Sequence, residues 1–223
     1  MPPDSILELD PNADPADLAN QIVTLPNGTD MGSDCVGKLG RVLLTGKPEE
    51  RNPAKYAQAF ALVRQDARAT AWMRFAAWAQ QLNGERRITG ADMSAIARDL
   101  GELAVQAADQ IPSGNPKFLL LGDVAYNRGI VNRGLRRYDD EELSQRESAA
   151  WFALAGNRAK SDTSLFAAQV GVVSAALVSG SSARIHMSIE ALVAARDFVF
   201  CQDYPYPAWM GDNAHLHPGF ERS

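Results

Sequence analysis

Four arginines within ten residues form the part of the sequence best suited to binding chemistry: Arg128, Arg133, Arg136 and Arg137. Guanidinium groups bind phosphates and carboxylates through paired, charge-assisted hydrogen bonds. On one continuous helix, Arg128 and Arg136 would lie near one line, and Arg133 and Arg137 would form a second pair. The segment is either a site for an anionic ligand or acidic partner, or a solvated face that pairs with the carboxylates of 139–142.

The histidines offer two weaker constellations. His215 and His217 could chelate a transition metal if a third ligand folded in, but histidines in a His-Pro-Gly loop are typically surface residues. His186 and Glu190 lie one helical turn apart, which suits a general base or, more simply, an exposed pair. The two cysteines fit no zinc-site spacing. The sequence therefore predicts neither a metal site nor a cofactor.

Several function classes are disfavoured by what the sequence lacks. It contains no Gly-rich phosphate loop, no G-x-S-x-G, no H-E-x-x-H and no dinucleotide fingerprint. A net charge of −5, with 3 basic and 9 acidic residues in 1–50, argues against nucleic-acid binding. The acidic, Pro-rich start lacks the basic and apolar regions of a signal peptide, so we expect a cytoplasmic protein.

A long uncharged helix, 164–180, is predicted to organise the fold. No charged residue occurs from Thr163 to Ala183, and a helix that is apolar nearly all round must be surrounded. Its serines and alanines, and the absence of a flanking basic cluster, favour a core helix over a membrane span. Small residues at 167, 171 and 175 would let neighbouring backbones come close.

Helical spacing and cap signals predict the other helices. They are expected at 33–44, 53–82, 93–111, 117–137, 140–158 and 182–199. The 140–158 helix should turn Leu143, Ala150, Trp151 and Leu154 inward. Gly122, Gly129 and Gly134 weaken the 117–137 helix, so they indicate either close packing or the approach of a ligand.

These elements predict an all-α protein, a single helical bundle of about seven helices. Residues 1–32 are expected to form an extended acidic arm with one short helical possibility at 16–23. The bundle would span 33–201, with possible halves at 33–111 and 116–201. Residues 202–223 form an irregular tail, in which Tyr204, Tyr206 and Trp209 either lie on the bundle or contact a partner.

Two functions remain open at this point. The first is a non-enzymatic scaffold or adaptor that acts through protein contacts, with a protein partner or a second copy of the chain. The alternative is a helical enzyme or small-molecule binder, with an anion-holding arginine pocket on the 117–137 helix. The orientation of the arginines, into a pocket or onto an open face, discriminates between the two.

Overall fold

The computed structural model describes residues 12–24, 43–44, 47, 49 and 51–200, with side chains described through Ala194. The described part of the chain contains eight helices and no strand, which confirms the all-α prediction. The helices are α1 (Pro15–Val23), α3 (Pro53–Gln65), α4 (Ala71–Glu85), α5 (Met93–Gln110), α6 (Asn115–Gly134), α7 (Tyr138–Leu154), α8 (Arg158–Ser179) and α9 (Ser182–Phe200).

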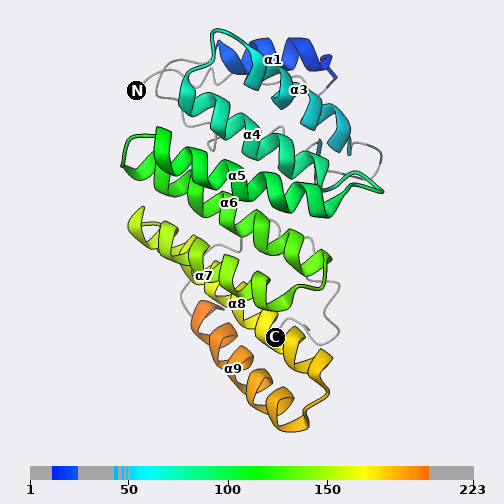
Figure 1. Ribbon diagram of the computed structural model, residues 1–223, viewed down its shortest axis with the longest axis vertical. Helices are drawn as coiled ribbons and strands as arrows, with labels where there is room; N and C mark the ends of the chain where they lie inside the picture. Colours follow the sequence, from blue (N-terminus) through cyan, green and yellow to red (C-terminus); the bar gives the residue numbers. More distant parts are fainter. Residues whose placement is uncertain (1–11, 25–42, 45–46, 48, 50, 201–223) are drawn as a thin grey trace.

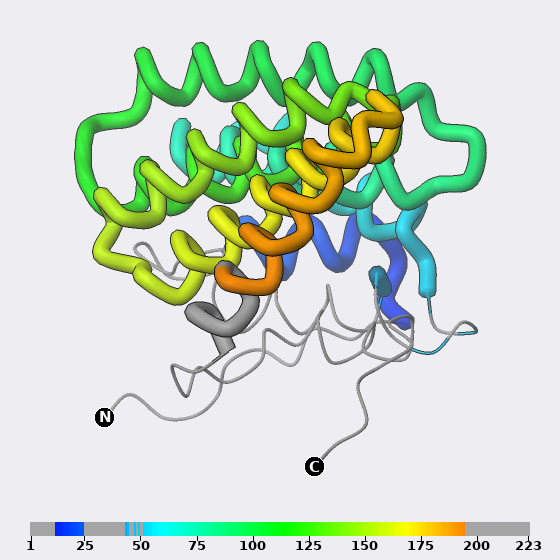
Figure 2. Tube along the Cα trace, turned by 90° about the horizontal axis from the view of Figure 1, so that it is seen from below, coloured from blue at the N-terminus to red at the C-terminus, as the bar shows by residue number. Residues whose placement is uncertain are grey.

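The helices are stacked in the order of the sequence (Figure 1). Each packs mainly on its neighbours along the chain, and α4 in addition meets α6. Helices α1 and α9 lie at opposite ends of the stack. Viewed along its long axis, α5 lies on one side of the molecule and α1 on the other (Figure 2). Short connections between antiparallel neighbours produce this kind of elongated helical stack.

A single apolar core runs through α1 to α6. Its largest fully buried side chains include Tyr56 and Phe60 of α3, whose ring centroids are 4.7 Å apart. Leu18 and Ile22 of α1 are also fully buried in this core. The short helix considered at 16–23 is therefore confirmed, and it belongs to the core, although it falls within the expected arm. The rest of the expected arm, residues 1–11 and 25–32, lies outside the described residues.

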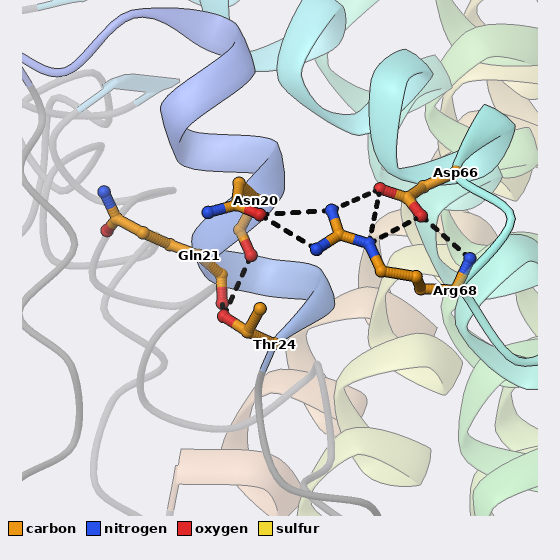
Figure 3. A network of polar contacts seen from close by, with 5 residues as sticks. All are labelled: Asn20, Gln21, Thr24, Asp66 and Arg68. Atoms are coloured by element: carbon orange, nitrogen blue, oxygen red, sulfur yellow. Dashed lines mark hydrogen bonds and ion pairs between the residues drawn. The ribbon is translucent and has the colours of Figure 1, made fainter.

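A polar network joins the end of α1 to the turn between α3 and α4 (Figure 3). Both terminal nitrogens of Arg68 donate to Asn20 Oδ1 at 3.1 Å, and Arg68 pairs with Asp66 at 2.7 Å. Thr24 closes the helix by donating its hydroxyl to the carbonyls of Asn20 and Gln21. Hydrogen bonds from Arg68 lower the pKa of the Asp66 carboxyl to about 2.

The prediction of one continuous helix over 53–82 is wrong, because the helix is interrupted between α3 and α4. The backbone of Asp66 is extended, and its carboxylate accepts the N–H of Arg68 at 2.8 Å. Thr70 then caps α4 by accepting the N–H of Met73 at 3.2 Å. The side-chain oxygens of Asp and Thr compete with the backbone carbonyls of a helix for these N–H groups. The apolar spacing continues across the break, so it gives no sign of the turn.

Other predicted helix ends also shift. Helix α4 continues through Gly84, where a Cβ would lie 3.0 Å from a ring carbon of Tyr56, so this glycine permits close packing and does not end the helix. Helix α6 ends at Gly134, short of the predicted residue 137. Helix α8 begins before the predicted stretch, because Asn157 accepts the N–H of Lys160 and caps it.

The turns that follow α6 and α7 have the same construction. In each, three residues separate the helices, and the third donates its N–H to a carbonyl five residues back. These bonds measure 2.9 Å from Arg137 and 2.8 Å from Asn157. The middle residue is left-handed in both turns, with φ of 58° at Arg136 and 69° at Gly156. This is the Schellman helix ending, for which glycine is the usual choice.

Helix α8 is long and apolar enough to cross a membrane, judged by length and composition alone. Core helices of soluble proteins satisfy the same criterion. In this structure α8 packs between α7 and α9. The expectation that it is not a membrane span remains a prediction.

Candidate functional site

Helix α7 turns a mostly polar face into the protein. Glu141, Gln145 and Ser148 are 0% exposed. Leu143 and Leu154, which were expected to point inward, are 66% and 60% exposed. Of the other two residues expected inward, Ala150 is exposed and Trp151 is half-buried. The predicted inward face is therefore wrong for Leu143, Ala150 and Leu154, whereas Trp151 packs against the core.

Two glycines of α6 make room for this face of α7. A Cβ at Gly129 would lie 2.4 Å from Gln145 Nε2, and one at Gly122 would lie 2.6 Å from Phe152 Cε1. Real Cβ atoms essentially never come so close, so a side chain at either position would force its neighbour to move. These two glycines thus mark close packing between helices, and the space beside them is filled by α7. A Cβ at Gly134, by contrast, would meet nothing within 4 Å.

Hydrogen bonds satisfy most of the buried polar groups at the α6–α7–α8 contact. Ser148 Oγ donates to the carbonyl of Gly122 at 2.8 Å and lies 3.0 Å from Ser164 Oγ. Ser161 Oγ donates to the carbonyl of Ala149 at 3.0 Å. Hydroxyls that bond backbone carbonyls in this way carry little desolvation penalty. Serine side chains can therefore occupy positions in this helix contact where apolar residues are usual.

The first two predicted arginines, Arg128 and Arg133, are engaged by α7. Arg128 donates to Ser144 Oγ at 3.2 Å and pairs with Glu147. Arg133 Nε donates to Glu141 Oε1 at 2.6 Å, and this carboxylate is fully buried. The other oxygen of Glu141 is buried without a hydrogen-bond partner among the described residues. Both guanidinium groups thus serve the α6–α7 interface.

The last two predicted arginines, Arg136 and Arg137, lie in the turn after α6 and are exposed. The expectation that Arg128 and Arg136 share one line of a helix is wrong, because the helix ends before Arg136. The four arginines consequently have two different settings: one pair in a helix contact and one pair in an exposed turn. A role for any of them in binding a ligand or partner remains a prediction.

Helix α8 packs against α7 through the side that carries its small residues. Ala167, Ala168 and Gly171 are buried, and a Cβ at Gly171 would lie 3.3 Å from Glu141 Cδ of α7. Leu177 and Val178 are 57% and 73% exposed. The expectation that this helix is surrounded on all sides is therefore wrong, although the close approach at its small residues is confirmed.

Large exposed apolar side chains concentrate in α7, α8 and α9. Of the ten among the described residues, eight belong to these three helices. We call these eight the C-terminal apolar set: Leu143, Leu154, Leu165, Leu177, Val178, Met187, Ile189 and Val193. The usual pattern is largely inverted here, because apart from Phe152 the buried residues of these helices are small or polar, while eight large apolar residues are exposed. Where exposed apolar side chains form one contiguous patch, they typically mark a surface that contacts another molecule.

Two arginines that the sequence did not single out, Arg86 and Arg87, follow α4. Burial, and then the charge of Arg87, lower the pKa of Arg86 to about 10. Arg86 Nε donates to Asn83 Oδ1 at 3.1 Å, and Arg87 donates to the carbonyl of Leu44. Neither forms an ion pair with a carboxylate among the described residues. The signal for them in the sequence is the adjacent Arg-Arg pair itself.

The remaining predicted sites fall into two groups. His186 and Glu190 form a pair at 3.3 Å with exposures of 78% and 67%, as expected for a simple surface pair. Within the described residues, no three His, Cys, Asp or Glu side chains are grouped to hold a metal ion. The predicted tail contacts and metal candidates lie outside the described residues: Tyr204, Tyr206, Trp209, His215 and His217.

The C-terminal apolar set is thus the candidate site. What it offers is apolar contact area, because its members carry no acid, base or nucleophile. Comparison with protein-family models, curated proteins and solved structures finds no match. Function is therefore inferred from the residues of this chain alone.

Proposed function

We propose that the protein is a non-enzymatic helical scaffold or adaptor, and that it binds a protein partner through α7, α8 and α9. The observation that carries this proposal is the inverted pattern of these helices. Buried alanines, serines and a glutamate hold them together, while eight large apolar side chains are exposed. We include a cytoplasmic location and the absence of a membrane span in the proposal.

The exposed apolar side chains offer a substantial part of the free energy that specific binding requires. Burying a large apolar side chain contributes about 1.5–3 kcal/mol relative to leaving it exposed. Val178, Met187 and Leu143 are 73%, 69% and 66% exposed, so most of their surface is still available. A few such residues would contribute several kcal/mol to the free energy of binding. Micromolar affinity corresponds to a binding free energy of about 8 kcal/mol. Part of that gain offsets the loss of translational and rotational freedom.

The alternative, a ligand pocket on α6, has less support. The space beside Gly122 and Gly129 is occupied by side chains of α7. Arg128 and Arg133, which would hold an anionic ligand, already pair with carboxylates. A ligand would have to displace both pairs. We therefore keep the scaffold as the proposed function.

The proposal is tested by replacing two members of the C-terminal apolar set, Leu165 and Leu177, with glutamine. The matched control is Val105→Gln, on α5, because Val105 is 71% exposed but lies outside the set. Proteins that co-purify with the wild type from the native source are identified, purified and titrated by calorimetry. We expect the double variant to lose at least tenfold in affinity, and the control to bind like the wild type.

Two results would contradict the proposal. One is a wild-type protein that co-purifies with no other protein at low salt. The other is a purified partner that binds the double variant and the control equally well. In either case the exposed apolar residues would not be the contact surface. Circular dichroism of all variants verifies that the helices are retained.

A further inference from the structure

The apolar core of the protein stops at α6. Among the described residues, every buried side chain of this core lies within 18–131. From α7 only the half-buried Trp151 lies against the core, and no described residue of α8 or α9 belongs to it. The apolar side chains that α7, α8 and α9 do bury, among those described, are Phe152 and four alanines. The free energy that comes from apolar burial is therefore concentrated in α1–α6.

The interior of the three C-terminal helices is mostly polar instead. Of the ten largest fully buried side chains, the two from α7 are Gln145 and Glu141, and the other eight come from α1, α3, α4 and α5. Glu141 Oε2 and Gln145 Oε1 are buried without a hydrogen-bond partner among the described residues. Such an acceptor has lost its water and gained no bond in exchange. The pair that Glu141 forms with Arg133 adds little net stability, because desolvation of the buried carboxylate offsets the attraction.

Helices α8 and α9 depend on α7 for their attachment to the rest of the protein. Helix α8 packs between α7 and α9, and α9 packs mainly on α8 (Figure 1). Lys160 of α8 pairs with Asp123 of α6 at 2.9 Å, but this pair is exposed and contributes little. Loss of the α6–α7 contact would therefore release all three helices together. Helical stacks open in such units, because each helix contacts mainly its neighbours.

We propose that α7, α8 and α9 open as one unit while α1–α6 stay folded. Opening returns Glu141 and Gln145 to water, so part of the cost of separating the helices is recovered. It also disrupts the whole C-terminal apolar set at once, because these three helices carry all eight members. Opening thus switches that surface off. This last consequence rests on the proposed function, whereas the opening itself is a property of the chain alone.

Hydrogen exchange of the purified full chain, followed by mass spectrometry of its peptides, measures the opening of each helix. After correction for intrinsic exchange rates, we expect peptides from α7, α8 and α9 to share one opening equilibrium. Their open state should be at least about tenfold more populated than the state that exposes the slowest peptides of α3, α4 and α5. Peptides of α7 and α8 that are protected as strongly as those of α3 would overturn the proposal. So would early exchange confined to α9, since α7 would then belong to the stable part.

Two matched substitutions distinguish partial opening from unfolding of the whole chain. Phe60 of α3 and Phe152 of α7 are 0% and 2% exposed, and each is replaced by leucine, which keeps most of the apolar volume. Phe60 stays packed in the proposed open state. Phe60→Leu should therefore speed exchange in α3–α5 about tenfold and leave α7–α9 at the wild-type rate. Phe152→Leu weakens the native state relative to both the open and the unfolded state, so it should speed exchange in both groups of helices by the same factor.

The Phe60→Leu result decides between the two kinds of opening. If it speeds exchange in α7–α9 as much as in α3–α5, the chain unfolds in one step and the proposal is wrong. Circular dichroism verifies that both variants keep their helices. None of these measurements involves a partner, so they are independent of the scaffold test. A chain that unfolds in one step can still bind a partner through the C-terminal apolar set, and a chain that opens at α7 can lack such a partner.

Discussion

Replacing Gly129 with alanine is the sharpest test of the packing between α6 and α7. A helix-interior glycine normally costs nearly 1 kcal/mol relative to alanine, so the change should stabilise an open site. Here the added Cβ would lie 2.4 Å from Nε2 and 2.8 Å from Cδ of Gln145. Gln145 is 0% exposed, so its amide can yield only within the buried contact and not into solvent.

The expected net effect follows from three contributions. Overpacking a buried contact costs about 1–3 kcal/mol. Displacing the amide of Gln145 also breaks its 3.2 Å hydrogen bond to the carbonyl of Tyr126, which costs about 1 kcal/mol more. The helix-propensity gain offsets about 1 kcal/mol of this. We expect Gly129→Ala to lower the free energy of unfolding by about 2 kcal/mol, which corresponds to a Tm lower by about 4–8 °C.

Urea unfolding followed by circular dichroism measures the effect, with Gly101→Ala as the matched control. Gly101 lies within α5, and a Cβ there would meet nothing within 4 Å. The control should therefore raise stability by about 1 kcal/mol. Placing Gly129→Ala in a Gln145→Ala background should turn its effect from destabilising to stabilising, because the obstructing side chain is gone. If Gly129→Ala is as stabilising as the control, α7 does not occupy this space and the reasoning fails.

Three further predictions concern other contacts. Gly171→Leu should lower stability by about 1–3 kcal/mol, since Glu141 lies against it; wild-type melting would show that Gly171 faces open space. Arg136→Gly should raise stability by about 1 kcal/mol, because it relieves an L-residue at φ 58°; a lower urea midpoint would contradict this. Asp66, whose pKa is lowered to about 2 by Arg68, stabilises the fold above about pH 4 and loses this effect as pH falls toward 2. Asp66→Asn should therefore flatten the acid-dependent part of the stability curve, and an unchanged curve would show that the pair contributes nothing.

The N-terminal half of the fold was largely predictable, because its helices follow apolar spacing and cap signals. Asn52 caps α3 through Lys55 at 2.9 Å, as the Asn-Pro pair predicts. At the second Asn-Pro pair, α6 begins at Asn115 itself, after Gly114. The break after Gln65 was not visible, since the apolar phase continues through it. Only the local hydrogen bonds of Asp66 and Thr70 produce that break.

The C-terminal half was less predictable, because its packing does not follow the rule that large apolar residues are buried. Leu143 and Leu154 appeared to be the inner face of α7, yet Gln145 and Ser148 occupy it. Which face of α7 is buried depends on the fit of its side chains against the glycines of α6, and this fit involves both helices. The sequence of one helix cannot show that fit. Of the four arginines, Arg133 pairs with Glu141, one of the carboxylates expected as partners, whereas Arg128 pairs with Glu147. Arg136 and Arg137 lie in the turn, and this division depends on where α6 ends.

The stacking of helices in sequence order has a consequence for how the chain is made. Almost every helix finds its packing partner in the segment just before it, and α4 with α6 is the main longer step. During translation, each helix can therefore dock as soon as it leaves the ribosome, because the surface that receives it has already been synthesised. Contacts this local also favour rapid folding. Helix α9 is the last described helix to emerge, so its exposed apolar side chains become available only when the helices before it have been made.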